Sequence, residues 1–87
     1  MNINKLSRNK QLETDSMNVE FGLAEAIANG MFIDARVTGS ILRNDSSYIS
    51  AEVLLREHGE IVTKHIAFSV INDVIYSAIP LTALCDL

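Results

Sequence analysis

An alternation of apolar and polar residues from residue 32 to residue 70 constrains the fold of this 87-residue chain more than any other feature. The apolar positions are odd within Phe32–Leu42, odd again within Tyr48–Glu57, and even within Glu60–Ile71. Alternation with a period of two is typical of strands that bury one face and expose the other. The pattern therefore predicts three antiparallel strands that share one apolar face.

The connections between these segments test the prediction. The dipeptide His58-Gly59 suits a two-residue hairpin turn, because glycine readily takes the positive φ that such turns need. A turn there sets Glu57 opposite Glu60 and pairs apolar residues on one face: Leu55 with Val62, Ala51 with Ile66, and Ile49 with Phe68. A loop over Arg43–Ser47 predicts three further pairs: Ile41 with Ile49, Val37 with Val53, and Ala35 with Leu55. A slip of one residue would turn each set to the other face, so the apolar matches favour both registers.

Residues after Val70 predict a fourth strand and a short final helix. A turn at Asn72-Asp73 gives a strand over Val74–Ile79, with two predicted pairs: Val70 with Ile75, and Ile66 with Ile79. A short helix over Pro80–Cys85 follows, because proline fits the first position of a helix.

A helix is predicted upstream of the sheet, over Asp15–Asn29. We expect it to pack on the sheet through one stripe of apolar residues at helical spacing: Met17, Phe21, Ala24, Ile27, Ala28 and Met31. Asn29-Gly30 is a suitable C-terminal stop. Gly22 weakens the helix by about 1 kcal/mol relative to alanine, and the alternation within residues 17–23 leaves a strand open for that part.

The predicted fold is therefore α+β, with an N-terminal helix packed on a three- to four-stranded antiparallel β-meander and a short C-terminal helix. Residues 1–13 are polar and are predicted to form a flexible N-terminal arm, and residues 14–87 a single α+β domain. Four strands make a face roughly 15–20 Å wide, whereas one helix is about 10–12 Å across. We therefore expect a homo-oligomer, most simply a homodimer, in which a second copy covers the rest of the apolar face.

Charge and cysteine content limit the partners and the location. The net charge is −4, and three basic residues without an acid fall in the first twelve positions, which leaves four basic and eleven acidic residues in the remainder. Direct nucleic-acid binding is not expected, because phosphate neutralisation needs clustered Lys and Arg. The one cysteine, Cys85, and a polar N-terminus without an apolar leader predict a reducing, cytoplasmic location, and no run of about 20 apolar residues predicts a membrane span.

One row on the polar face of the predicted sheet could carry chemistry. The predicted registers align Thr38, Glu52 and His65, and a carboxylate beside an imidazole is the basis of general base catalysis. An open sheet face forms no pocket, so a stabilising polar pair is the simpler interpretation, as it is for Asp34 opposite Arg56. No metal-ligand spacing or phosphate-binding loop occurs, so we expect neither a metal nor another cofactor.

A second row on the same face indicates a partner site, since contiguous exposed aromatic and aliphatic residues favour protein contacts. It consists of Leu42, Tyr48, Ser69 and Tyr76. We expect a small acidic non-enzymatic protein-interaction module, an inhibitor or regulatory subunit of a larger complex such as a nucleic-acid-binding one, with a phage-type inhibitor as the nearest class. The alternative is a small-ligand-binding protein or weak hydrolase whose site forms between the subunits of a dimer.

Overall fold

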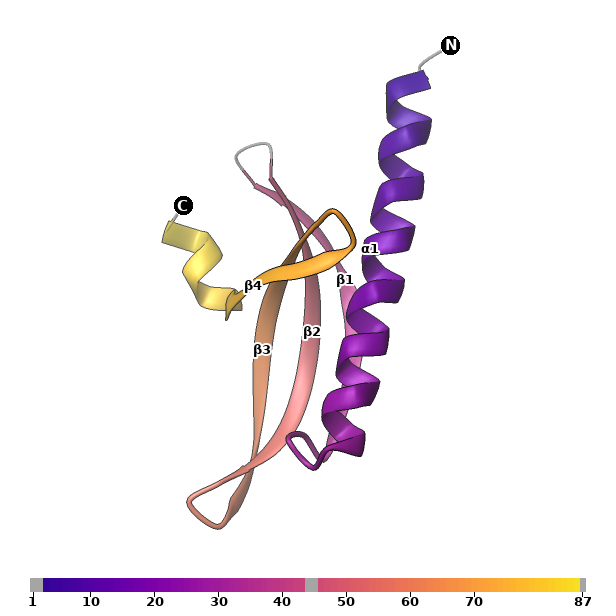
Figure 1. Ribbon diagram of the computed structural model, residues 1–87. Helices are drawn as coiled ribbons and strands as arrows, with labels where there is room; N and C mark the ends of the chain where they lie inside the picture. The colour runs from indigo at the N-terminus through magenta and orange to yellow at the C-terminus, as the bar shows by residue number, and fades with distance from the viewer. Residues whose placement is uncertain (1–2, 44–45, 87) are drawn as a thin grey trace.

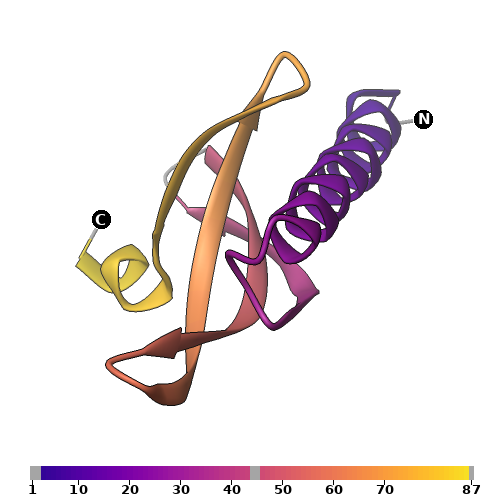
Figure 2. The same ribbon diagram turned by 60° about the horizontal axis from the view of Figure 1, so that its bottom comes forward.

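The computed structural model describes residues 3–43 and 46–86, with side chains for 11–43 and 46–84. Its elements in chain order are α1 (Ile3–Ala28), β1 (Asp34–Arg43), β2 (Ser46–Glu57), β3 (Glu60–Ile71), β4 (Val74–Pro80) and the 3-10 helix η1 (Leu81–Asp86). The strands form one antiparallel sheet in the order β1-β2-β3-β4, with α1 on one side and η1 on the other (Figure 1; Figure 2). The predicted α+β fold is confirmed, and the terminal helix is a single 3-10 segment that follows Pro80.

Two tight turns lie where the sequence predicts them. His58 and Gly59 have φ of 54° and 82°, and Asn72 and Asp73 have φ of 51° and 64°. Two successive residues with positive φ match the twist of a hairpin. The β2–β3 register from Glu57–Glu60 to Ile49–Phe68 agrees with the prediction at every pair.

The predicted register between β1 and β2 is wrong. Arg43 faces Ser46, so the connection is shorter than the expected loop over residues 43–47; Asn44 and Asp45 lie outside the described residues. The shorter connection shifts the end of β1 by one residue, so Ile41 faces Tyr48 instead of Ile49. A bulge between Val37 and Gly39 adds a second one-residue shift in the first half of β1, which returns its apolar side chains to the predicted face: Ala35 faces Val53 and Val37 faces Ala51.

A second bulge interrupts the pairing of β3 with β4. Val70 faces Ile75 as predicted, but Ser69 faces Ser77, so Tyr76 is the extra residue on β4. Beyond the bulge Ile66 faces Pro80, and its predicted pairing with Ile79 is wrong.

Helix α1 begins twelve residues before the predicted start at Asp15. The segment expected as a flexible arm is helical from Ile3 onward, and Leu12 packs against the core. Its Lys, Leu, Arg, Gln and Glu residues favour helix, and it contains neither glycine nor proline. It carries no apolar stripe, which is why periodicity did not reveal it. The flexibility of residues 1–13 stays a prediction.

The other end of α1 agrees with the prediction. Gly30, with φ of 78°, follows the helix, and the amide of Met31 donates to the carbonyl of Ala26 at 2.8 Å. Residues 17–23 are helical, so the strand alternative is wrong.

The core lies between α1 and the middle of the sheet. Its buried members are Val19 and Leu23 of α1, Ile49, Ala51 and Val53 of β2, and Phe68 of β3. The predicted helix stripe is wrong, because Met17 and Phe21 are 54% and 68% exposed. Two apolar sets recur at helical spacing on α1, and the set that contains Val19 and Leu23 faces the sheet.

Candidate functional site

The sheet divides into two hairpins at one end. The ladder between β2 and β3 stops at the pair Ile49–Phe68; beyond it β2 continues only against β1, and β3 only against β4. The two hairpin ends diverge, and the β3–β4 end lies beside α1 (Figure 1; Figure 2). We call this divided end the fork, and it comprises Ser46–Tyr48, Ser69–Ile71 and Val74–Ser77.

Two contacts attach the β3–β4 end of the fork to the helix. Asn18 Nδ2 donates to Asp73 Oδ1 at 3.3 Å. One turn later along α1, Gly22 lies so close to Ile75 that a Cβ atom at residue 22 would be 2.9 Å from Ile75 Cδ1. The position of the fork therefore depends on α1 as well as on the sheet.

A hollow of about 460 Å³ opens in the fork. It is lined by Gln11, Asp15, Ser46, Ser47, Tyr48, Ser69, Val70, Ile71, Tyr76 and Ser77. Asp15 is buried, and its Oδ1 accepts a hydrogen bond of 2.9 Å from Gln11 Nε2. The hydroxyls of Ser69 and Ser77 share a hydrogen bond of 2.7 Å. The hollow thus combines one carboxylate with several hydroxyl groups, all of which can accept hydrogen bonds.

Three of the four predicted partner-binding residues meet at this hollow, namely Tyr48, Ser69 and Tyr76. Leu42 does not line it; Leu42 is exposed near the end of β1, opposite Ser47. The short connection between β1 and β2 causes the difference, because it places Ile41 instead of Leu42 opposite Tyr48.

Two helix residues of the hollow were missed by sequence reasoning, Gln11 and Asp15. Gln11 falls in the predicted arm, and Asp15 is the first residue of the predicted helix. The helix-favouring composition of residues 3–14 was the available signal.

Large apolar side chains are exposed on the rim of the hollow. Ile71, Val74 and Tyr76 lie on one hairpin end, and we call them the fork patch. Ile71 is 52% exposed and Tyr76 is 73% exposed. A bulge can redirect a side chain at the edge of a sheet, and Tyr76 is the bulged residue. The fork patch is thus an apolar surface at the edge of a hollow that contains a carboxylate and hydroxyl groups.

The predicted polar row is only partly formed. Glu52 faces His65 as predicted, but Arg36 faces Glu52 in place of Thr38. Arg36 Nη2 donates to Glu52 Oε2 at 3.0 Å, so this carboxylate takes part in a surface ion pair.

Thr38 and Asp34 of β1 also have other neighbours than predicted. The Thr38 hydroxyl lies 2.9 Å from that of Ser50. Asp34 faces Leu54, so its predicted pairing with Arg56 is also wrong.

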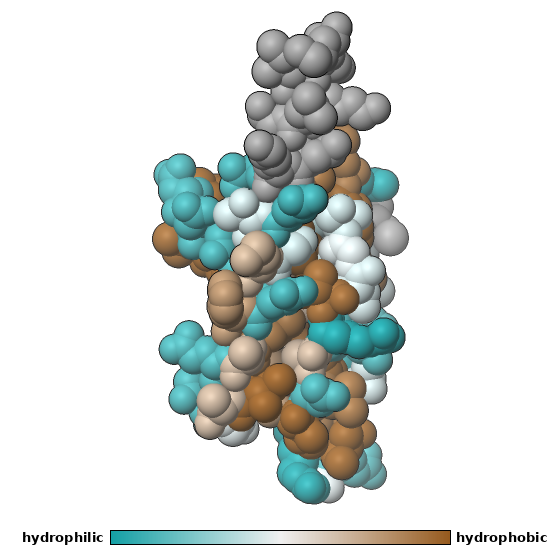
Figure 3. All heavy atoms as spheres, turned by 90° about the vertical axis from the view of Figure 1, so that its right-hand side faces the viewer, coloured by the Kyte–Doolittle hydropathy of each residue, from teal (hydrophilic) through white to brown (hydrophobic). Residues whose placement is uncertain are grey.

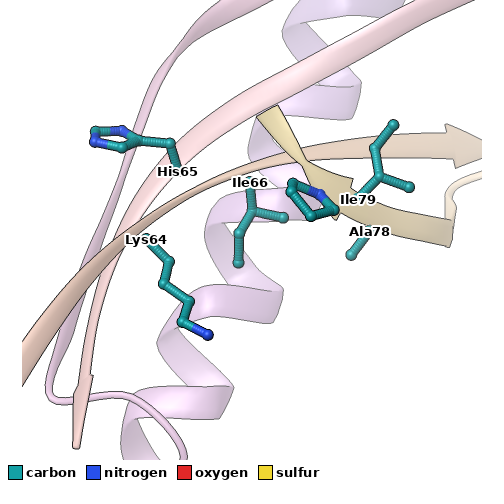
Figure 4. Close-up of a pocket in the computed structure, with 6 residues that line it drawn as sticks. Lys64, His65, Ile66, Ala78 and Ile79 are labelled. Carbon is teal, nitrogen blue, oxygen red and sulfur yellow. The ribbon is translucent and has the colours of Figure 1, made fainter. Parts of the chain in front are cut away.

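A second hollow, of about 380 Å³, adjoins His65 where β4 leaves the sheet. It is lined by Lys64, His65, Ile66, Ala78, Ile79 and Pro80. Figure 4 shows His65 pointing away from Ile66 and Ile79. The surface between these strands is therefore mainly apolar, and the imidazole is not turned toward its isoleucines.

Two general features bear on the kind of site. Within residues 3–43 and 46–86, no three His, Cys, Asp or Glu side chains are grouped closely enough to hold a metal ion. In the same part of the chain, neither helix combines the length and the apolar composition needed to cross a bilayer.

Comparisons with protein-family models, with curated proteins and with solved structures found no match to this chain.

Proposed function

We propose that this chain is a non-enzymatic protein-interaction module that binds a partner protein through the fork. The observation that carries the proposal is the fork patch, in which Ile71, Val74 and Tyr76 are all more than half exposed on one hairpin end. Adjacent large apolar side chains at a surface favour contact with another macromolecule. Tyrosine suits such contacts, because its ring adds apolar area and its hydroxyl stays hydrogen-bonded.

The hollow behind the fork patch supports a proposal for the chemistry of the partner. Asp15 and the fork hydroxyls accept hydrogen bonds, so a partner segment with N–H donors beside an apolar anchor is complementary to them. The net charge of −4 favours a basic partner surface. These properties support a role as an inhibitor or regulatory subunit of a larger cytoplasmic complex, including one that binds nucleic acid.

The experiment compares two isoleucines of β3 that differ in position but not in exposure. Ile71 is in the fork patch and is 52% exposed, whereas Ile61 is near the opposite end of the strand and is 55% exposed. A partner is first isolated by affinity purification from the native source and then titrated with each purified variant. Ile71→Ser and Tyr76→Ser should each weaken binding about tenfold or more, and Ile61→Ser should leave it unchanged.

Circular dichroism serves as the control for folding. All three substituted side chains are exposed, so the spectra should match that of the original chain. Equal affinity of the Ile71→Ser and Ile61→Ser variants would contradict the proposal, as would failure to isolate any stoichiometric partner.

A further inference from the structure

The solvent-facing side of α1 carries an ordered apolar seam. Met17, Phe21, Ala24 and Ala28 are all exposed, and we call them the α1 seam. Val19 and Leu23 of the same helix are buried against the sheet. Figure 3 views the molecule from the α1 side and shows apolar side chains gathered along its lower part, between hydrophilic neighbours. The seam spacing of four, three and four residues is that of the inward positions of a coiled coil.

We propose that the α1 seam packs antiparallel against the α1 seam of a second copy of this chain, with the two-fold axis between Phe21 and Ala24. The homodimer would use the side of α1 that faces away from the sheet. The inference goes beyond the proposed function, because the fork contributes no residue to this interface.

The sizes of the seam residues favour the antiparallel arrangement. Antiparallel pairing about this axis sets Met17 opposite Ala28 and Phe21 opposite Ala24 of the second copy. Every layer then combines one large and one small side chain, which fills an interface evenly. Parallel pairing would instead set Phe21 against Phe21 and Ala24 against Ala24, so two crowded layers would lie at one end of the seam and two empty layers at the other.

The charges beside the seam favour the same arrangement. Glu20 and Glu25 are exposed and flank the seam on opposite sides. In a parallel pair, Glu20 would approach Glu25 of the second copy, and these like charges would repel each other. In the antiparallel pair, Glu20 lies nearest Ile27 of the second copy and Glu25 lies nearest its Asn18. Of the two arrangements, only the antiparallel one therefore avoids placing two acidic residues close together.

The oligomeric state of the full chain tests the proposal. Four seam layers make a small interface, so we expect a dissociation constant in the range of about 1–100 μM. Sedimentation equilibrium between about 1 and 500 μM should show the mass of one chain rising to that of two. Phe21→Glu should weaken the dimer at least about 100-fold, because the charge would be buried at the centre of the seam. Ile61→Glu, at an exposed isoleucine on the sheet, should dimerise like the original chain.

Disulfide trapping tests the orientation. In a Cys85→Ser background, chains with Met17→Cys and chains with Ala28→Cys are oxidised separately and as a mixture. Cross-linked dimers should form efficiently only in the mixture, because a disulfide needs Cβ atoms about 3.5–4.5 Å apart. Efficient cross-linking of either variant with itself would indicate parallel packing and would overturn the proposal.

Two other results would also overturn it. One is the mass of a single chain over the whole concentration range. This outcome counts against the dimer even if the seam binds an added amphipathic helical peptide rich in Lys and Arg. The other is a dimer that persists after Phe21→Glu. Phe21 is 68% exposed in the single chain, so the Phe21→Glu variant should fold normally. An unchanged circular dichroism spectrum would then exclude misfolding as the reason why this variant is a monomer.

Discussion

A single missing side chain decides how closely α1 approaches β4. Gly22 lies in the interior of the helix, where glycine is less favourable than alanine by about 1 kcal/mol. Its position over Ile75 explains why a glycine is useful there, since a Cβ would lie 2.9 Å from Ile75 Cδ1. That δ-methyl is the far end of a flexible side chain, so it can move at modest cost. At this residue, helix propensity therefore favours alanine, whereas the close contact with Ile75 favours glycine.

A double-mutant cycle between these residues separates the two effects. Gly22→Ala in the original chain should raise the free energy of unfolding by less than about 1 kcal/mol, because part of the gain in helix propensity is lost in displacing Ile75. In an Ile75→Val background, which lacks the δ-methyl, Gly22→Ala should raise the free energy of unfolding by nearly the full difference in helix propensity, about 1 kcal/mol. Urea unfolding of the four proteins gives the comparison. Equal gains in both backgrounds would show that Gly22 and Ile75 are not in contact.

At the scale of elements, the sequence predicted the pairing correctly at the His58-Gly59 turn and wrongly where the length of a connection or a bulge changes it. His58-Gly59 has only one plausible hairpin geometry, so the predicted β2–β3 register was correct. The bulge after Val37 leaves no comparable mark in the alternation, and the β1–β2 register could not be read from residue types.

For the helix and for the candidate site, too, part of the structure could not be predicted from the sequence. The exposed set with Met17 and Phe21 is as regular as the buried set with Val19 and Leu23, so periodicity could not identify the face that packs on the sheet. The gathering of Tyr48, Ser69 and Tyr76 was predictable, because all three lie at the same end of adjacent hairpins. The divergence of these hairpins and the contribution of Asp15 needed the three-dimensional arrangement.

The turn between β2 and β3 gives a direct test of this account. Gly59 has φ of 82°, where alanine is strained, so Gly59→Ala should lower the free energy of unfolding by about 1–2 kcal/mol. Gly39→Ala is the matched control, because a Cβ there would lie at an ordinary 3.7 Å from Ser50 Oγ and Gly39 is not among the residues with positive φ. It should leave stability unchanged or raise it slightly. Chemical denaturation of both variants gives the values, and an equal loss would contradict a cost specific to the positive φ of Gly59.

At the scale of the whole molecule, the two proposed interfaces lie on different sides. The molecule is elongated, with extents of 53 × 29 × 18 Å, and α1 runs along one side of a thin sheet (Figure 1). The fork is at one end of that sheet, whereas the α1 seam faces away from it. A dimer formed through the seams would therefore leave both forks available, so that one assembly could hold two partner segments. Such bivalence strengthens attachment to a partner that is itself repeated or oligomeric.

The first residues of α1 should be nearly dispensable for this architecture. Among the residues whose side chains are described, Leu12 is the earliest to pack against the core, and the seam begins at Met17. A chain that starts at Gln11 should therefore melt within about 5 °C of the full chain, which corresponds to less than about 1 kcal/mol. It should also dimerise with the same dissociation constant. Leu12→Ala in the full chain should lose about 1–2 kcal/mol, because it removes a half-buried core contact. If thermal unfolding showed the shortened chain to be less stable than the Leu12→Ala variant, the first ten residues would have to contribute to packing, and the boundary of the domain would move to the start of α1.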